Sequence, residues 1–209
     1  DLKVSKKMKQ LDEMLIVYEK DSQELLEKIE KITEIENVQR IEIIRVKEMY
    51  RETIDHFESI RFKVEEFVPN LLDIFNEIDD SFVKLEGMMN NQLFEDAKEF
   101  TKDIEAKVIW VNQRLEDLPS YIAVVRQYMP KKVAHIQGLI QIMTEEKFSL
   151  NQLDAYNRLN MIQTTLEESI GHIKKLELDN IGEVLQNLSD AIDSLIQDLE
   201  GEKRSFDEF

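Results

Sequence analysis

The most constraining feature of this sequence is a long apolar stripe that repeats every seven residues. Residues 2–85 contain no glycine and one proline, Pro69. The first part of the stripe consists of Met8, Leu11, Leu15, Tyr18, Leu25, Ile29 and Ile32, and the second part of Phe57, Ile60, Val64, Phe67, Leu71, Ile74, Ile78 and Leu85. Such spacing keeps one narrow seam facing a neighbouring helix over many turns. The stripe therefore predicts long helices that pack on other helices.

The composition agrees with a helical protein and excludes several classes of function. Of 209 residues, 34% are charged and only 5 are glycine and 3 proline, which is typical of bundles and coiled coils. The net charge of −17 argues against nucleic-acid binding and against direct adhesion to anionic membranes. The clearest basic cluster, Lys3, Lys6, Lys7 and Lys9, is interpreted as a solvated helix end. The chain has no cysteine, which excludes disulfides and thiolate metal sites.

Three short polar breaks divide the chain into four expected helices. The breaks lie near residues 87–92, 147–151 and 177–180, so the helices are expected at about 1–86, 92–147, 151–177 and 180–207. Connections of about five residues or fewer force consecutive helices to lie antiparallel. The predicted fold class is therefore all-α, an elongated antiparallel rod of three-helix bundles with long shared helices.

The second expected helix contains two prolines, Pro119 and Pro130. An interior proline normally breaks a helix, at a cost of about 3 kcal/mol. The heptad positions before Pro119, such as Leu115, share one phase with those after Pro130, such as Ile136. A full loop between them would be expected to scramble that phase. We therefore predict that the helix kinks at Pro119 and Pro130 but remains one element.

The sequence offers no constellation for catalysis. A carboxylate-bridged metal site in a bundle needs a Glu three residues before a His, and none of His56, His135 and His172 has one. Adjacent acidic pairs point about 100° apart on a helix and do not converge on one water. Phosphate loops, nucleophile elbows and zinc spacings are missing from the sequence. We expect no catalytic, cofactor-binding or metal-binding residue, no cofactor, and a protein that is not an enzyme.

Three apolar side chains are weak candidates for partner contacts. Trp110 lies next to the stripe position Val111 and is a candidate anchor for a partner, although packing against a neighbouring helix is the favoured interpretation. Met88 and Met89 lie at the first expected break, where they would either form an adaptable contact or cover the end of the hairpin. The stripe between Met8 and Ile32 has no obvious intrachain partner of matching length. Self-association of the chain is therefore a further hypothesis.

Three groups of residues carry a resemblance to a known family. Their order and spacing resemble the septation-ring formation regulator family, EzrA. The groups are Ile29-Glu30-Lys31-Ile32 leading to Tyr50-Arg51-Glu52; Leu118-Pro119-Ser120-Tyr121 with Met129-Pro130-Lys131-Lys132; and Leu176-Glu177-Leu178-Asp179-Asn180 with Ala191-Ile192-Asp193 and Leu199-Glu200-Gly201-Glu202. The resemblance implies spectrin-like triple-helix repeats.

The resemblance also implies a cellular role. Members of the family act at the bacterial division site, on the cytoplasmic face of the cell membrane, where they contact FtsZ and restrain its assembly into rings. The family's N-terminal membrane anchor and C-terminal repeats would lie outside residues 1–209, so that membrane contact runs only through a segment absent from this chain. The chain begins at Asp1, inside a helical pattern and without an initiator Met, so we expect a piece of a longer protein. No functional residue of the family maps onto it.

Two other functions remain as alternatives. One is a mechanical coiled-coil tether or spacer that binds no filament. The other, less favoured, is a membrane-active helical bundle, which would need an apolar hairpin of membrane length. The nearest apolar stretch, residues 64–75, is short and carries Glu65, Glu66 and Asp73.

Overall fold

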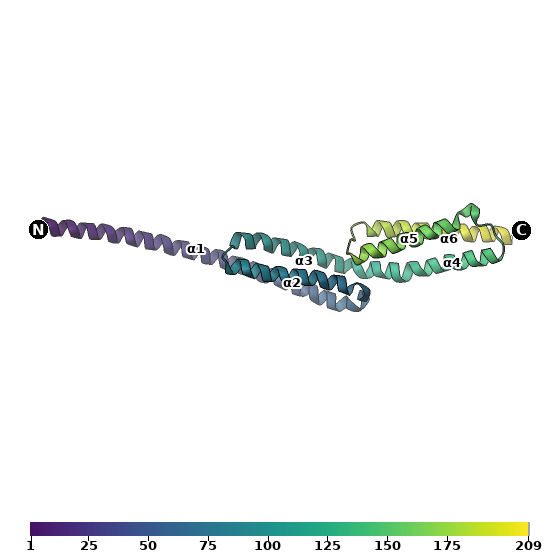
Figure 1. Ribbon diagram of the computed structural model, residues 1–209, viewed down its shortest axis with the longest axis horizontal. Coiled ribbons are helices and arrows are strands. Elements are labelled where there is room, and N and C mark those ends of the chain that lie inside the picture. Colours follow the sequence, from purple (N-terminus) through teal and green to yellow (C-terminus); the bar gives the residue numbers. More distant parts are fainter. Residues whose placement is uncertain (209) are drawn as a thin grey trace. The chain divides into compact units, whose positions relative to one another are not determined.

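A computed structural model describes residues 1–208, and the chain is helical over most of that length (Figure 1). The helices are α1 (Leu2–Ile60), α2 (Val68–Asn90), α3 (Phe94–Ala123), α4 (Met129–Glu145), α5 (Ala155–Lys174) and α6 (Ile181–Asp207). Short 3-10 turns cover Arg61–Lys63, Glu65–Phe67 and Asn151–Leu153, and a π-helical turn covers Val124–Tyr128. Residues 1–208 contain no strand. The predicted all-α fold class is confirmed.

The helices form two compact units. The first contains residues 1–51 and 78–108, so it combines parts of α1, α2 and α3. The apolar side chains that fill its core include Ile43, Val46, Leu85, Met89, Ala97 and Ile104. One buried polar contact crosses this core, because Gln39 Nε2 donates a hydrogen bond to Thr101 Oγ1 at 2.9 Å. The rings of Tyr50 and Phe82 also meet, with centroids 5.6 Å apart.

The second unit contains residues 52–77 and the chain from residue 109 onward. Its helices α4, α5 and α6 lie side by side (Figure 1). Their apolar faces meet in a core that includes Ile136, Met143, Ile162, Ile173, Leu188 and Leu195. The end of α1 and the start of α2 belong to the same unit, where the rings of Phe57 and Phe75 lie 5.1 Å apart. The short connections predicted between these helices thus produce a three-helix packing.

The expectation of a single helix over residues 1–86 is wrong. α1 ends at Ile60, and the chain turns through two 3-10 turns before α2 begins at Val68. Pro69 is the second residue of α2, in the first helical turn, where its missing N–H costs little. Val64 and Phe67 are buried inside the turn. The turn therefore keeps the seven-residue rhythm, which is why spacing alone did not reveal it.

The expected second helix is helical without interruption from residue 94 to residue 145. Pro119 lies inside α3, and Pro130 is the second residue of α4. Immediately before Pro130 the helix widens, and Met129 N–H bonds to Val124 O, five residues back. A proline has no N–H and its ring clashes with the carbonyl four residues earlier, so a π-turn accommodates it. Helical continuity through both prolines agrees with the constant heptad phase, and a kink at each stays a prediction.

Three helices end in the same backbone motif without glycine. After α2, Gln92 takes a left-handed conformation (φ 59°), as do Lys147 after α4 (φ 62°) and Leu176 after α5 (φ 59°). At the first of these ends, Leu93 N–H bonds to Met88 O and Gln92 N–H to Met89 O, at 2.9 and 3.1 Å. This pair of bonds defines a Schellman motif, whose left-handed position is usually glycine. The sequence therefore predicted breaks close to these three helix ends, but no glycine marked the exact position of the left-handed residue.

We expect the change Lys147→Gly to raise the free energy of unfolding by about 0.5–1 kcal/mol. Glycine adopts the left-handed conformation without the steric cost that lysine carries, and it loses part of that gain through greater freedom when unfolded. Lys147 is exposed, so no packing is lost. Leu176→Gly is the opposite case, because Leu176 is buried and its loss should destabilise the chain by about 1.5–3 kcal/mol. Urea unfolding of both variants measures these two changes in the free energy of unfolding. A Lys147→Gly variant less stable than the original chain would contradict the first prediction.

Candidate interaction surfaces

The first surface is the amino-terminal part of α1. Residues 1–35 are all exposed, and no other helix lies beside this purple segment in Figure 1. We call its apolar stripe the α1 seam; it consists of Val4, Met8, Leu11, Leu15, Tyr18, Leu25, Ile29 and Ile32. These side chains are between 49% and 71% exposed. Since helices of globular proteins are stabilised mostly by packing of an amphipathic face, the seam is a surface suited to a partner.

The second surface is a groove between α1 and α3 in the first unit, with a volume of about 450 Å³. It is lined by Glu34, Ile35, Val38, Gln39, Glu42, Phe94, Glu95, Lys98, Thr101, Lys102 and Glu105. Thr101 Oγ1, at the buried Gln39 contact, donates in turn to Ala97 O at 2.6 Å. Arg45 bonds to Glu42 and, at 2.8 Å, to Glu105. The hydrogen bond from Arg45 lowers the pKa of the Glu42 carboxyl.

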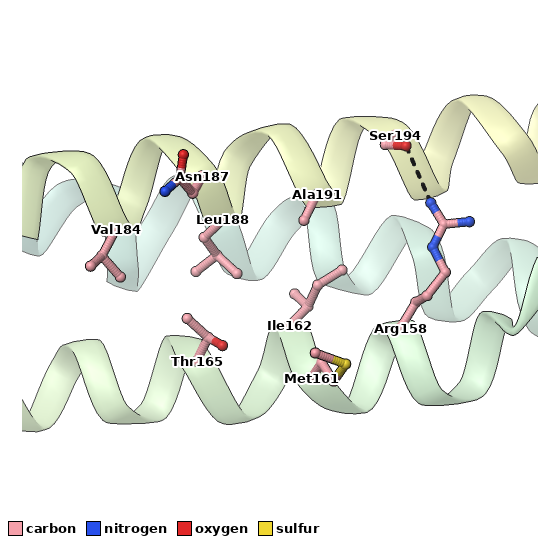
Figure 2. A pocket seen from close by; sticks show the side chains of 9 residues that line it. All are labelled: Arg158, Met161, Ile162, Thr165, Val184, Asn187, Leu188, Ala191 and Ser194. Atoms are coloured by element: carbon pink, nitrogen blue, oxygen red, sulfur yellow. Dashed lines mark hydrogen bonds between the residues drawn. The ribbon is translucent and has the colours of Figure 1, made fainter.

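The third surface is a groove of about 560 Å³ between α5 and α6 (Figure 2). Its apolar wall is formed by Met161, Ile162, Val184, Leu188 and Ala191. Arg158 closes one end, where it donates to Ser194 Oγ at 3.2 Å and to Asp198 Oδ2 at 2.7 Å. Met161 is 70% exposed. A shallow apolar groove along two helices has the form that accepts an amphipathic helix.

An ionic cluster in the second unit joins the turn before α2 to the end of α5. Glu66 pairs with Lys174 at 3.0 Å and also with Arg126 of the π-turn. Asn70 Nδ2 donates a hydrogen bond to the main-chain oxygen of Lys174. The hydrogen bonds from Lys174 and then from Arg126 lower the pKa of Glu66. The cluster thus couples three segments that are distant in sequence.

We expect Glu66→Gln to lower the free energy of unfolding at pH 7 by about 0.5–1 kcal/mol, a modest figure because the Glu66 side chain is half exposed to screening solvent. The pKa of Glu66 is lower in the folded chain than its ordinary value of 4.5. Its stabilising contribution is therefore complete above the ordinary value and is lost as the pH falls through the folded value. Urea unfolding of both proteins at pH 7 and near pH 3 checks this. A difference that stays constant over that range would contradict it.

The structure gives Trp110 contacts within its own chain. The ring is half-buried, and the Arg114 guanidinium lies 4.7 Å above its centroid. Arg114 donates to Asp179 at 2.6 Å, although its Nε is buried without a partner. Sequence reasoning did not identify this pairing, because Arg114 and Asp179 are 65 residues apart. A role for Trp110 toward a partner stays a prediction.

The two methionines at the first break lie in different environments. The expected loop is wrong at this point, because α2 continues to Asn90 and both Met88 and Met89 are helical. Met89 is 2% exposed and belongs to the core of the first unit, so the suggestion that it contacts a partner is corrected. Met88 is half-buried, and its role stays a prediction. The error arose because Gly87 lies inside the helix, whereas Gln92 takes the left-handed position after it.

No group of three or more His, Asp or Glu residues within residues 1–208 is placed to hold a metal ion. The three histidines have side-chain neighbours. His172 Nδ1 lies 2.6 Å from Glu177, His135 Nε2 lies 3.3 Å from Glu200, and His56 Nδ1 lies 3.3 Å from Asn112. In the same residues, none of the helices combines the length and the apolar character that crossing a bilayer requires.

Comparison with known proteins identifies the family. The family model described as "Septation ring formation regulator, EzrA" matches residues 2–209. The chain belongs to the EzrA family. The resemblance found in the sequence is confirmed, and members of this family are regulators of septation ring formation in cell division. No solved structure matches the chain.

Curated EzrA proteins of three Bacillus species are similar to this chain. The Bacillus subtilis protein is 25% identical over 194 residues, and the Bacillus velezensis protein is 20% identical over 193 residues. Each alignment covers 92% of this chain and 34% of the relative. The Bacillus licheniformis protein is 22% identical over 177 residues, which is 77% of this chain and 31% of the relative. The chain thus spans about a third of the length of these relatives.

Proposed function

We propose that this chain is an interaction region of a bacterial cell-division regulator that binds FtsZ filaments and limits their assembly into rings. The observation that carries the proposal is the match of the septation regulator family to residues 2–209. The fold supports it, because long helices with an uncovered apolar seam and two grooves offer surfaces for proteins. The described residues offer no metal cluster.

The proposal extends to the setting of the chain. In it, a membrane anchor precedes these residues and further repeats follow them in the whole protein, so that the chain works at the cytoplasmic face of the membrane at the septum. The helical units would then hold the division filament at a distance from the membrane. With a net charge of −17, the chain would gain selectivity from charge, and most of its binding energy would come from docking on helix faces.

Cosedimentation with polymerising FtsZ tests the proposal. We expect the chain to enter the pellet when FtsZ is polymerised with GTP, and to stay in the supernatant when FtsZ is kept unpolymerised with GDP. A chain that stays in the supernatant while the polymers pellet would contradict filament binding and favour a spacer without a filament partner. Release of dye from anionic liposomes would instead favour a membrane-active bundle, and we expect none.

We also propose that the chain self-associates. The support is the α1 seam, whose eight apolar side chains are each at least 49% exposed. Exposed contiguous apolar surface of this kind marks an interaction site. This proposal is independent of filament binding, because it concerns a surface that contacts a second copy of the chain.

A further inference from the structure

A set of side-chain bonds in the second unit crosses the π-turn at Val124–Tyr128. Each bond joins a residue that precedes the π-turn in the chain to a residue that lies in it or after it. The bonds run from Glu66 to Arg126, from Glu66 to Lys174, from Asn70 to the main-chain oxygen of Lys174, and from Arg114 to Asp179. They therefore connect the turn before α2 and the helix α3 with the end of α5 and with the turn between α5 and α6.

The π-turn is a weak point of the helix that runs from residue 94 to residue 145. Met129 N–H bonds to Val124 O, five residues back, so the turn is wider than the α-helix on either side. Pro130 follows directly and has no N–H to donate, which removes one more bond of the helical ladder. Sharp bends in long helices concentrate at prolines and at π-turns, and here the two coincide. A change in the direction of α4 relative to α3 therefore meets the least resistance at this place.

We propose that the π-turn is a hinge within the second unit, and that Glu66 is the latch that keeps it closed. The Glu66 carboxylate binds Lys174 Nζ at 3.0 Å and also binds the Arg126 guanidinium. One carboxylate thus ties the turn before α2 both to the hinge and to α5. When these bonds open, α4, α5 and α6 rotate as a group relative to the part of the unit that precedes the hinge. The inference goes beyond the proposed function and depends neither on filament binding nor on self-association.

The latch is accessible to solvent, so its strength depends on salt. The side chains of Glu66, Lys174 and Arg126 are each between 40% and 44% exposed. The hydrogen bonds from the two cations lower the pKa of Glu66, so the carboxylate is charged at neutral pH. Exposed ion pairs contribute modestly to stability and are screened as the ionic strength rises. A modest free energy suffices to shift the balance between two arrangements of similar stability.

A second bond holds the turn between α5 and α6 against α3. Arg114 donates to Asp179 at 2.6 Å, and its side chain is 14% exposed, whereas Asp179 is 84% exposed. The Arg114 guanidinium also lies over the ring of Trp110, which keeps it in place. The start of α6 lies close to α3 as well, since a Cβ at Gly182 would be 3.4 Å from Tyr121 Oη. Because this bond does not involve Glu66, loss of the latch opens the hinge only in part.

A distance measured across the hinge tests the proposal, because the chain has no cysteine of its own and two spin labels are easily placed. Asn76→Cys in α2 and Asn160→Cys in α5 are exposed sites on opposite sides of the hinge in the chain. Pulsed electron spin resonance of the doubly labelled chain, diluted with unlabelled chain, should show one main distance at low salt. We expect Glu66→Gln to raise the ratio of open to closed chains about two- to fivefold. Salt at about 1 M should have a similar effect on the original chain.

Glu65→Gln is the matched control for the latch. Glu65 is the neighbouring exposed carboxylate and takes no part in the bonds that cross the hinge, so its loss should leave the distances unchanged. Lys174→Glu should open the hinge, because two carboxylates then face each other. Combining it with Glu66→Lys restores the pair with exchanged charges and should close the hinge in part, since Arg126 then faces a lysine. Far-UV circular dichroism should be unchanged in every variant, which shows that the helices remain folded.

Pro130→Ala tests where the bend lies. Alanine supplies the N–H that proline lacks and favours a regular helix. We therefore expect this change to narrow the distribution of distances at high salt, when the latch is open. The label positions stay the same, so a narrower distribution reports a stiffer hinge.

Three results would overturn the proposal. The same distances in the original chain, in Glu66→Gln and at high salt would show that Glu66 does not hold the two parts together. Equal opening by Glu65→Gln would show a general effect of charge. A distribution that Pro130→Ala leaves unchanged would show that the bend lies elsewhere. Because the measurement uses neither FtsZ nor contact between copies, its failure is distinguishable from failure of the proposed function.

Discussion

Replacing Phe57 by alanine is expected to lower the free energy of unfolding by about 3–5 kcal/mol. Phe57 is 1% exposed, and its ring lies 5.1 Å from Phe75 at a tilt of 58°. The guanidinium of Arg61 adds a contact 5.6 Å from the ring centroid. Alanine would remove these contacts and leave a cavity where α1 and α2 meet, and close-packed helices relax only partly into such a space. Urea unfolding followed by circular dichroism measures the loss.

Phe62 provides the matched control for this change. It is five residues away and 73% exposed, and the Lys63 ammonium lies 5.6 Å from its ring centroid. Phe62→Ala should therefore change the free energy of unfolding by no more than about 0.5 kcal/mol. Equal losses for the two variants would mean that the turn between α1 and α2 is not packed as described. A small loss of stability for Phe57→Ala, whatever the result for Phe62→Ala, would lead to the same conclusion.

The second large effect is expected for Leu85→Ala, in the first unit. Leu85 is 1% exposed in the core that α1, α2 and α3 share. Truncation of a buried leucine costs about 2–5 kcal/mol, through lost transfer free energy and the residual cavity. Because Leu85 and Phe57 lie in different units and far apart in sequence, their effects should add in the double variant. The measurement is again the urea midpoint and slope.

Val83 is the control for Leu85, two residues earlier in α2. Its side chain is 73% exposed, so Val83→Ala should shift the midpoint little. A loss for Val83→Ala as large as that for Leu85→Ala would show that a different face of α2 is buried. Strong non-additivity between Leu85→Ala and Phe57→Ala would contradict the division into two units.

Much of the fold follows from the spacing of apolar residues. The stripe positions Val64, Leu71, Ile78 and Leu85 are buried, and the expected helices at about 151–177 and 180–207 correspond to α5 and α6 within four residues at each end. The spacing of the apolar residues predicts which face of a helix is buried, because a buried helix face is apolar. The same spacing does not show where the chain reverses direction when the apolar residues of the turn continue it. That is why the break after Ile60 was missed.

The exact residues at which the helices end were also not predicted, for a different reason. Gln92, Lys147 and Leu176 adopt left-handed conformations, and none of these residue types has a preference for that region. Glycine would have marked the ends, but Gly87 lies inside α2. The backbone bonds of the Schellman motif, together with tertiary packing, stabilise these conformations.

The candidate surfaces could be predicted only in part from the sequence. The seam from Met8 to Ile32 was found by its period and by the lack of a matching segment. The groove between α1 and α3 and the pairing of Glu66 with Lys174 depend on contacts between distant residues, which no local pattern encodes. Met89 shows a different limit of local patterns. An apolar residue near a break can be either buried or exposed, and Met89 is buried.

The central proposal is that a second copy of the chain covers the amino-terminal part of α1, and hydrogen exchange tests it most directly. In dilute solution, where the chain is monomeric, amides of residues 2–35 should exchange much faster than those of residues 39–60, because an isolated helix opens easily. Raising the protein concentration should slow exchange in residues 2–35 alone. Equal protection of both segments in the dilute monomer, or exchange that does not depend on concentration, would contradict the claim.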